Sequence, residues 1–303
     1  MCASLKIWWL TGLACSMVVA MPAFADGSRP LCSTMYSFAG YVSPSAVDMN
    51  GLLQPSPAMD ATAQRADLLG VLAAQRAAHV AGTTQRAIDD SEMNCARFKD
   101  VLGPELKTAR AALKVVTEGA FAASLVTGPP KRYWKRARPY VVSKEVEALG
   151  DAAPGGDMAA TELDQPCDLY PAPRDAAEEA ILAARKARER FEKDYTSYPS
   201  GHAAFGFGCA ALLSAMVPEQ RAELYARGRQ YAESRVIIGV HFPTDIEQGR
   251  VAGAIGMALL MQNATYQRLF QQARTELRAA LHYPAALPEL EPDKDFFRQV
   301  PPR

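Results

Sequence analysis

Apolar residues recur along most of the chain at the spacing of an amphipathic helix, as Leu68, Leu69 and Leu72 illustrate. Runs of the β-branched residues that strands favour are few and short. Alanine, the strongest helix former, is abundant. The pattern therefore predicts an all-α fold, a single-domain helical bundle.

Proline, glycine and capping residues divide this pattern into separate helices. Pro104 suits the first turn of one of them, and Thr83-Thr84 could cap another. The expected helices cover residues 61–79, 83–98, 104–125, 175–194, 202–216, 218–234, 245–261 and 266–281. Residues 41–57 are expected to be extended, residues 152–173 to form a loop and residues 284–303 to be a disordered tail. No domain boundary interrupts residues 26–283, so we expect one domain there.

Residues 1–25 have the pattern of a secretory signal peptide. Lys6 gives a positive start, an apolar run covers residues 7–20, and Ala23-Phe24-Ala25 is a small-x-small cleavage site. An uncleaved membrane anchor and a lipoprotein attached at Cys15 are weaker alternatives. We therefore expect an exported, periplasmic protein that begins at Asp26.

Charge and cysteine content narrow the classes of partner. The chain carries 33 basic and 33 acidic residues, so losing Lys6 with the leader leaves a slight acidic excess, which argues against nucleic acid. No run after the leader looks long and apolar enough to cross a bilayer, so we expect no stable membrane insertion. The cysteines expected in the mature chain permit two disulfides in any of three pairings. They are Cys32, Cys95, Cys167 and Cys209. A buried free thiol is the alternative for Cys209, and no Cys/His cluster suggests a metal site.

Two of the four histidines lie at chain breaks beside other polar residues, whereas His79 and His282 lie in ordinary helical stretches. His202 ends the sequence Tyr-Pro-Ser-Gly-His, directly before an apolar helix. Ser200 can cap that helix, and Gly201 lets an anion approach its free N–H groups. A plain helix start with an incidental histidine is the competing interpretation.

The second histidine, His241, precedes Phe-Pro-Thr-Asp245. We expect Thr244 and Glu247 to form a capping box, which places Asp245 in the first helical turn. From there its carboxylate can fix the tautomer of His241 and leave the other ring nitrogen free to attack. The alternative is that Asp245 serves only the helix dipole.

A basic segment, residues 131–138, supplies five cations in eight positions. Taken alone, it is typical of a solvated helix face. Combined with the histidines, it suggests a pocket in which Lys131, Arg138 and Arg235 neutralise a phosphate dianion.

Three stretches together resemble the signature of the PAP2 superfamily: Lys131-x6-Arg138-Pro139, Pro199-Ser-Gly-His202 and Ser234-Arg235-x5-His241-x3-Asp245. Within it the chain looks most like class A bacterial non-specific acid phosphatases. Two features depart from that pattern: Ala203 replaces the usual threonine, and residues 152–194 make the spacing before Pro199 unusually long.

The resemblance implies an acid phosphatase, a phosphoric monoester hydrolase acting on small phosphate monoesters without metal or other cofactor. His241 would form a phosphohistidine, His202 would be the acid and base, and Asp245 would orient His241. The phosphate-binding residues implied are Lys131, Arg138, Ser200, Gly201 and Arg235. A homo-oligomer is also expected, and transfer of phosphate to alcohols stays open. The alternatives are a vanadium-dependent haloperoxidase and a non-catalytic periplasmic anion-binding protein.

Overall fold

The computed structural model describes residues 40–150, 153 and 194–289. These residues form helices, turns and loops without any strand, which confirms the predicted all-α class. The expected signal peptide, the expected helix before Asp194 and most of the expected loop and tail lie outside the described residues.

The helices have the following bounds. The longer ones are α3 (Thr62–Ala81), α6 (Arg110–Ser124), α10 (Gly201–Met216), α11 (Arg221–Ile237), α12 (Pro243–Leu260) and α13 (Ala264–Ala280). The shorter ones are α2 (Met49–Leu52), α4 (Thr84–Asp89), α5 (Lys99–Leu102), α7 (Gly128–Trp134) and α8 (Pro139–Val142). The 3₁₀ turns are η2 (Cys95–Phe98), η3 (Pro104–Lys107), η4 (Leu125–Thr127) and η6 (Pro218–Gln220).

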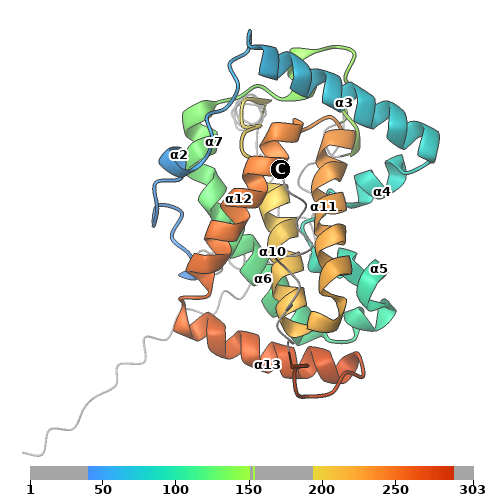
Figure 1. Ribbon diagram of the computed structural model, residues 1–303, viewed down its shortest axis with the longest axis vertical. Helices are drawn as coiled ribbons and strands as arrows, with labels where there is room; N and C mark the ends of the chain where they lie inside the picture. Colours follow the sequence, from blue (N-terminus) through green and yellow to red (C-terminus); the bar gives the residue numbers. More distant parts are fainter. Residues whose placement is uncertain (1–39, 151–152, 154–193, 290–303) are drawn as a thin grey trace, which may run out of the picture. The chain divides into compact units, whose positions relative to one another are not determined.

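Helix α10 is the centre of the bundle. It is apolar on nearly every side, and its buried residues include Phe205, Leu212 and Leu213. A helix of this composition is stable only when other helices surround it. Helices α6, α11 and α12 pack against it, as Figure 1 shows. The start of α10 is therefore held within the packed bundle.

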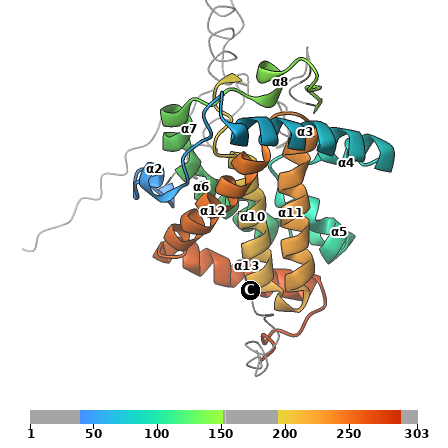
Figure 2. The same ribbon diagram turned by 45° about the horizontal axis from the view of Figure 1, so that its top comes forward.

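The two ends of the bundle are covered by different helices. Helix α3 crosses the end at which α11 leads into α12, and α13 crosses the opposite end (Figures 1 and 2). The polar residues at the α11–α12 turn consequently lie beside α3.

Glycines allow α12 to approach α10 closely. A Cβ atom at Gly249 would lie 2.3 Å from the carbonyl oxygen of Ser200, and one at Gly253 would lie 2.7 Å from that of Ala204. Both distances are shorter than a van der Waals contact, so any larger residue would push the helices apart. In this close packing the amide of Ser200 donates to the carbonyl oxygen of Asp245 at 2.9 Å.

A disulfide joins Cys95 of η2 to Cys209 of α10, with their Cα atoms 5.5 Å apart. The alternative of a free thiol at Cys209 is therefore wrong. The bond fixes the segment after α4 to the central helix across a sequence separation of 114 residues. Cys32 and Cys167 lie outside the described residues.

Two predicted helices are interrupted. The helix expected over 83–98 ends at Asp89, and a 3₁₀ turn follows in which the side chain of Asn94 accepts from the amide of Ala96. The helix expected over 104–125 is a 3₁₀ turn at Pro104 followed by α6. Side chains such as that of Asn94 compete for backbone groups, and the spacing of apolar residues in the sequence does not reveal this competition.

We expected no run of residues that could span a bilayer. That expectation is wrong as far as length and composition go, because one stretch is long and apolar enough. The stretch Arg110–Val142 passes both tests, and half of its most apolar window is buried. Its apolar part is α6, which packs against α10, α12 and α13. Core helices of soluble proteins pass the same tests, so one such stretch is weak evidence for a membrane span.

Candidate active site

The turn between α11 and α12 positions His241. Gly239 lies in this turn with a φ of 78°, a left-handed conformation that favours glycine. The amide of His241 donates to the carbonyl oxygen of Arg235 at 3.2 Å. Pro243 then starts α12, so the imidazole is fixed between the end of one helix and the start of the next.

Asp245 caps α12, and the predicted capping box of Thr244 and Glu247 is wrong. The helix begins two residues earlier than expected, so Asp245 occupies the third position and accepts from the amide of Phe242 at 2.8 Å. Glu247 instead pairs with Arg250. The predicted place of Asp245 in the first turn is confirmed.

The two ring nitrogens of His241 face groups of opposite character. Nδ1 lies 3.3 Å from Oδ2 of Asp245, and Nε2 lies 3.4 Å from a guanidinium nitrogen of Arg138. A carboxylate only accepts and a guanidinium only donates. The arrangement therefore favours the neutral tautomer with a proton on Nδ1 and a lone pair on Nε2.

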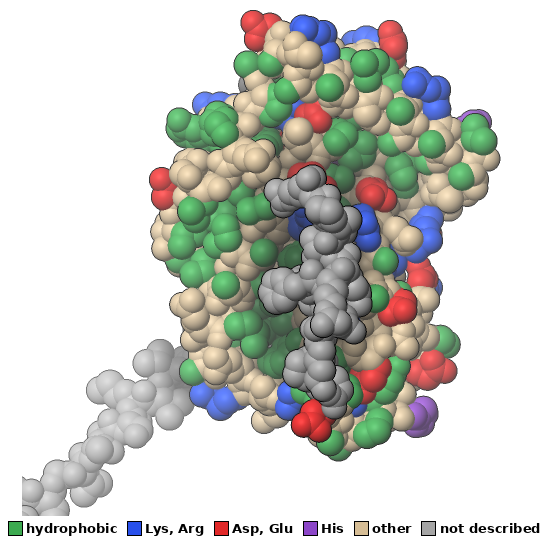
Figure 3. Space-filling view, in the orientation of Figure 1, with side chains coloured by type: hydrophobic (Ala, Val, Ile, Leu, Met, Phe, Trp, Pro, Cys, Tyr) green, Lys and Arg blue, Asp and Glu red, His purple; other side chains and the backbone are tan. Residues whose placement is uncertain are grey.

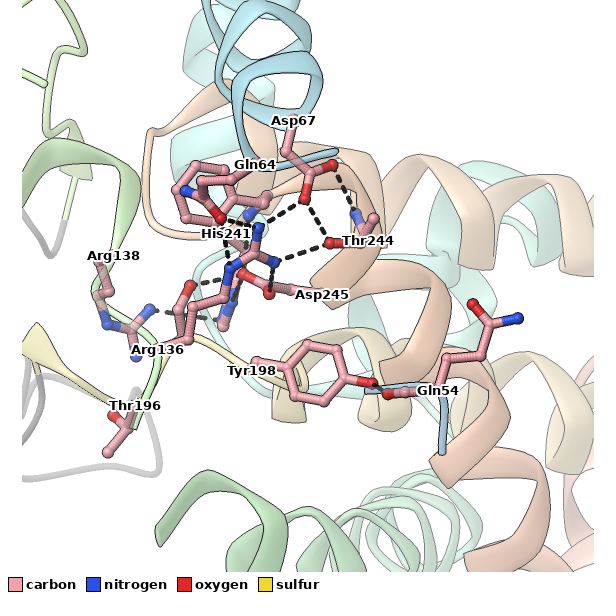
Figure 4. A network of polar contacts seen from close by, with 12 residues as sticks. Gln54, Gln64, Asp67, Arg136, Arg138, Thr196, Tyr198, His241, Thr244 and Asp245 are labelled. Carbon is pink, nitrogen blue, oxygen red and sulfur yellow. Dashed lines mark hydrogen bonds and ion pairs between the residues drawn. The ribbon is translucent and has the colours of Figure 1, made fainter. Parts of the chain in front are cut away.

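Asp245 is completely buried and has further partners that the sequence analysis missed. Ser197 donates its hydroxyl to Oδ2 at 2.5 Å. Arg136 donates to Oδ1 at 2.6 Å (Figure 4). These charge-assisted bonds stabilise the ionised carboxylate. In the sequence Arg136 is one of the five cations of the basic segment, and Ser197, directly before the Tyr-Pro-Ser-Gly-His sequence, was assigned no role.

His202 lies in the first turn of α10. The predicted N-cap is confirmed, because the hydroxyl oxygen of Ser200 accepts from the amide of Ala203 at 3.2 Å. Nε2 of His202 lies 3.0 Å from the carbonyl oxygen of Ser91. A carbonyl can only accept, so Nε2 carries the proton and Nδ1 is the nitrogen left for chemistry.

The predicted phosphate-binding cations surround this pair of histidines. Lys131 donates from Nζ to the carbonyl oxygen of Thr196 at 2.6 Å, and its stem lies beside Gly201. Arg138 donates to the carbonyl oxygen of Val240 at 2.7 Å. Arg235 lies in the last turn of α11, buried like Arg138. The structure thus brings together every site residue predicted from the sequence.

The positive charges perturb both histidines. Burial, then the charges of Arg138, Lys131 and Arg235, hold the pKa of His241 well below 6.5. Burial, then Arg235, likewise lowers the pKa of His202 well below 6.5. Such a concentration of positive charge at a helix N-terminus is a favourable environment for an anion.

The pKa of Lys131 is also lowered well below 10.5, first by burial and then by the charge of Arg138. Asp245 acts in the opposite direction, and Arg235 adds to the lowering. A bound dianion would reverse this effect, because it adds negative charge beside the ammonium group.

The arginines of the site belong to the interior of the fold. Figure 3 shows acidic and basic side chains interspersed on one face of the described residues. By contrast, Arg136, Arg138 and Arg235 are each less than a tenth exposed. Their charge therefore acts mainly on the site, where screening by salt is weak.

The family model of the PAP2 superfamily matches residues 112–269, just over half of the chain, and the chain belongs to this superfamily. The match contains all the site residues that were predicted. It also agrees with the all-α fold described above.

Curated relatives share part of this region. The chain is 42% identical over 81 residues to a non-specific acid phosphatase of Salmonella typhimurium, covering 27% of this chain and 32% of that protein. It is 38% identical over 80 residues to one of Providencia stuartii, covering 26% and 32%. It is 32% identical over 99 residues to an acid phosphatase of Zymomonas mobilis, covering 33% and 37%. The chain thus spans about a third of the length of the curated relatives it matches.

The lowered pKa values predict that acid destabilises the unliganded protein. As the pH falls through 6.5, the unfolded chain binds protons that the folded His202 and His241 do not, so the free energy of unfolding falls. We expect a loss of about 2 kcal/mol from these two residues between pH 7.5 and pH 5.5, measured by urea denaturation without phosphate.

The control is a pair of variants. Replacing both His202 and His241 with Asn should flatten the pH dependence, whereas replacing the exposed His79 and His282 with Asn should leave it unchanged. If the free energy of unfolding depended on pH equally in the two double variants, the attribution of this dependence to His202 and His241 would be contradicted.

Proposed function

We propose that the protein is an acid phosphatase that hydrolyses small phosphate monoesters through a phosphohistidine on His241. The observation that carries this proposal is the orientation of the imidazole, with Asp245 at Nδ1 and the Arg138 guanidinium at Nε2. A nucleophile of this kind needs a free lone pair directed at the place where the phosphorus atom binds.

In the first step, the phosphoryl oxygens bind Lys131, Arg138 and Arg235 and the free amides at the start of α10. Nε2 of His241 attacks phosphorus, and the bond from phosphorus to the ester oxygen breaks. The leaving oxygen takes a proton from Nδ1 of His202. The cations stabilise charge on the equatorial oxygens of the transition state, a large contribution in phosphoryl transfer.

In the second step, water attacks the phosphohistidine. Nδ1 of His202 accepts a proton from that water, the bond from phosphorus to Nε2 breaks, and its electron pair returns to the ring of His241. Phosphate leaves, and His202 has regained the proton it gave to the alcohol.

The lowered pKa values fit activity in acid. His241 stays neutral, and so remains a nucleophile, at a pH where a free histidine would be protonated. His202 must be protonated for the first step. A bound phosphate dianion would raise the pKa of His202, so that the ring can carry this proton.

The compartment and the absence of a metal requirement are part of the same proposal. Export to the periplasm is supported by the pattern of residues 1–25 and by the disulfide between Cys95 and Cys209, because disulfides persist in oxidising compartments. Lys131, Arg138 and Arg235 supply the charge neutralisation that a metal would otherwise provide. The names of the relatives in Salmonella and Providencia support a broad range of substrates.

His241→Ala should lower the rate of phosphate release from p-nitrophenyl phosphate by at least about a thousandfold, because it removes the Nε2 lone pair that attacks phosphorus. The measurement is steady-state release at acidic pH with and without a chelator, with folding checked by circular dichroism. His79→Ala, at an exposed position of α3, is the matched control and should keep the wild-type rate.

Three outcomes of this experiment contradict the proposal. Full activity of His241→Ala would rule out His241 as the nucleophile. Strong inhibition of the wild type by the chelator would rule out metal-free chemistry. Phosphate binding without turnover by the wild type would instead indicate the non-catalytic anion-binding protein. A separate assay with vanadate tests the other alternative. Vanadate should inhibit phosphate release by the protein, whereas peroxide-dependent halide oxidation with vanadate would favour the vanadium-dependent haloperoxidase.

His202→Ala should affect substrates according to their leaving group. An alkyl oxygen leaves only with a proton, whereas nitrophenolate leaves readily without one. The rate of the first step should therefore fall by at least about tenfold more for an alkyl phosphate than for p-nitrophenyl phosphate. Stopped-flow and quench measurements of that step give the ratio, and equal losses for both esters would rule out His202 as the acid.

A further inference from the structure

A second buried carboxylate lies behind the His241–Asp245 pair. Arg136 donates to Oδ1 of Asp245 at 2.6 Å with one guanidinium nitrogen and to Oδ2 of Asp67 at 2.6 Å with another. Its remaining bonds go to Gln64 and Thr244. Figure 4 shows Arg136 between the two carboxylates.

Helix α3 fixes the outer end of this chain of charges. Asp67 and Gln64 both lie on α3, which precedes the residues matched by the family model. Asp67 also accepts from the amide of Thr244 at 3.2 Å and from the Thr244 hydroxyl. One carboxylate thus binds both the arginine and the first turn of α12.

These groups are almost completely removed from solvent. Asp67 is 5% exposed, Arg136 is 4% exposed and Asp245 is fully buried. The guanidinium also lies over the ring of Phe242, 4.1 Å from its centre. Buried charges of this kind persist only when they are paired and hydrogen-bonded, and their interactions are poorly screened.

We propose that Arg136 and Asp67 are positioning residues for the nucleophile: Arg136 holds the Asp245 carboxylate against His241, and Asp67 fixes Arg136 and balances its charge. This inference rests on the proposed function for its kinetic consequences. Its electrostatic consequences for His241 do not depend on turnover.

The two residues carry opposite charges, so their removal should move His241 in opposite directions. Arg136→Gln removes a positive charge and its bond to the Asp245 carboxylate, so the pKa of His241 should rise. Asp67→Asn removes one of the two negative charges that pair with Arg136, so the surroundings of His241 become more positive and its pKa should fall. A purely structural loosening would let water into the site in both variants and would move the pKa the same way.

Several other charged or titratable groups face His241, and neither variant replaces them. They are Lys131 of α7, Arg138 before α8, His202 of α10, Arg235 of α11 and Asp245 of α12. The comparison of the two variants cancels their common effect.

The experiment is an NMR titration of the histidine rings in the phosphate-free protein, which has only four histidines in the full chain. We expect the pKa of His241 to move by about half a pH unit or more, upward in Arg136→Gln and downward in Asp67→Asn. The kcat for p-nitrophenyl phosphate should fall by about tenfold or more in Arg136→Gln, with KM changed by less than about threefold.

Arg136→Lys is the conservative variant. It keeps the charge but cannot bridge two carboxylates, so its kcat and pKa should lie between those of the wild type and Arg136→Gln. It also provides a readout if Arg136→Gln does not fold.

The matched control is Glu219→Gln, which removes the partner of another buried arginine, Arg278 of α13. Helix α13 lies at the opposite end of the bundle from α3 (Figures 1 and 2). This variant should lower the free energy of unfolding without changing the pKa of His241 or the kcat.

Shifts of the His241 pKa in the same direction, or no shift in folded Arg136→Lys and Asp67→Asn, would overturn the inference. A wild-type protein that binds phosphate but does not turn over would contradict the proposed function alone, because opposite pKa shifts would still support the positioning role.

Discussion

The site depends on one buried carboxylate. Asp245 has no exposed surface, and its two oxygens accept from Arg136, Ser197, the amide of Phe242 and the ring of His241. The same residue caps α12, so the start of a core helix and the tautomer of the histidine are set by one group. An uncompensated buried carboxylate would cost several kcal/mol, which explains why so many donors converge on it.

The bundle brings the remaining groups to that carboxylate. Glycine contacts let α12 approach the start of α10, so Ser200 and His202 lie beside the α11–α12 turn. The cations come from α7, the segment before α8 and the end of α11. Burial and then their summed charge hold the pKa of both histidines well below 6.5, and a phosphate dianion would offset that charge.

Much of this arrangement could be predicted from local sequence. Ser200 before an apolar helix and Asp245 four residues after His241 are short-range patterns, and both were confirmed in place. Arg136 and Asp67 could not be recognised, because their pairing joins residues 69 positions apart and depends on how α3 crosses the bundle. The break after Asp89 was missed because hydrophobic spacing gives no sign of the 3₁₀ turn that follows, which the side chain of Asn94 caps.

The most direct test of the account is to identify the group that becomes phosphorylated. The wild-type protein would be mixed with excess p-nitrophenyl phosphate, quenched within milliseconds in alkali, which preserves phosphohistidine, and mapped by mass spectrometry. The account predicts a burst of nitrophenol and a phosphate on the peptide that contains His241. Turnover with the phosphate on another residue, or with no phosphorylated protein under burst conditions, would contradict it.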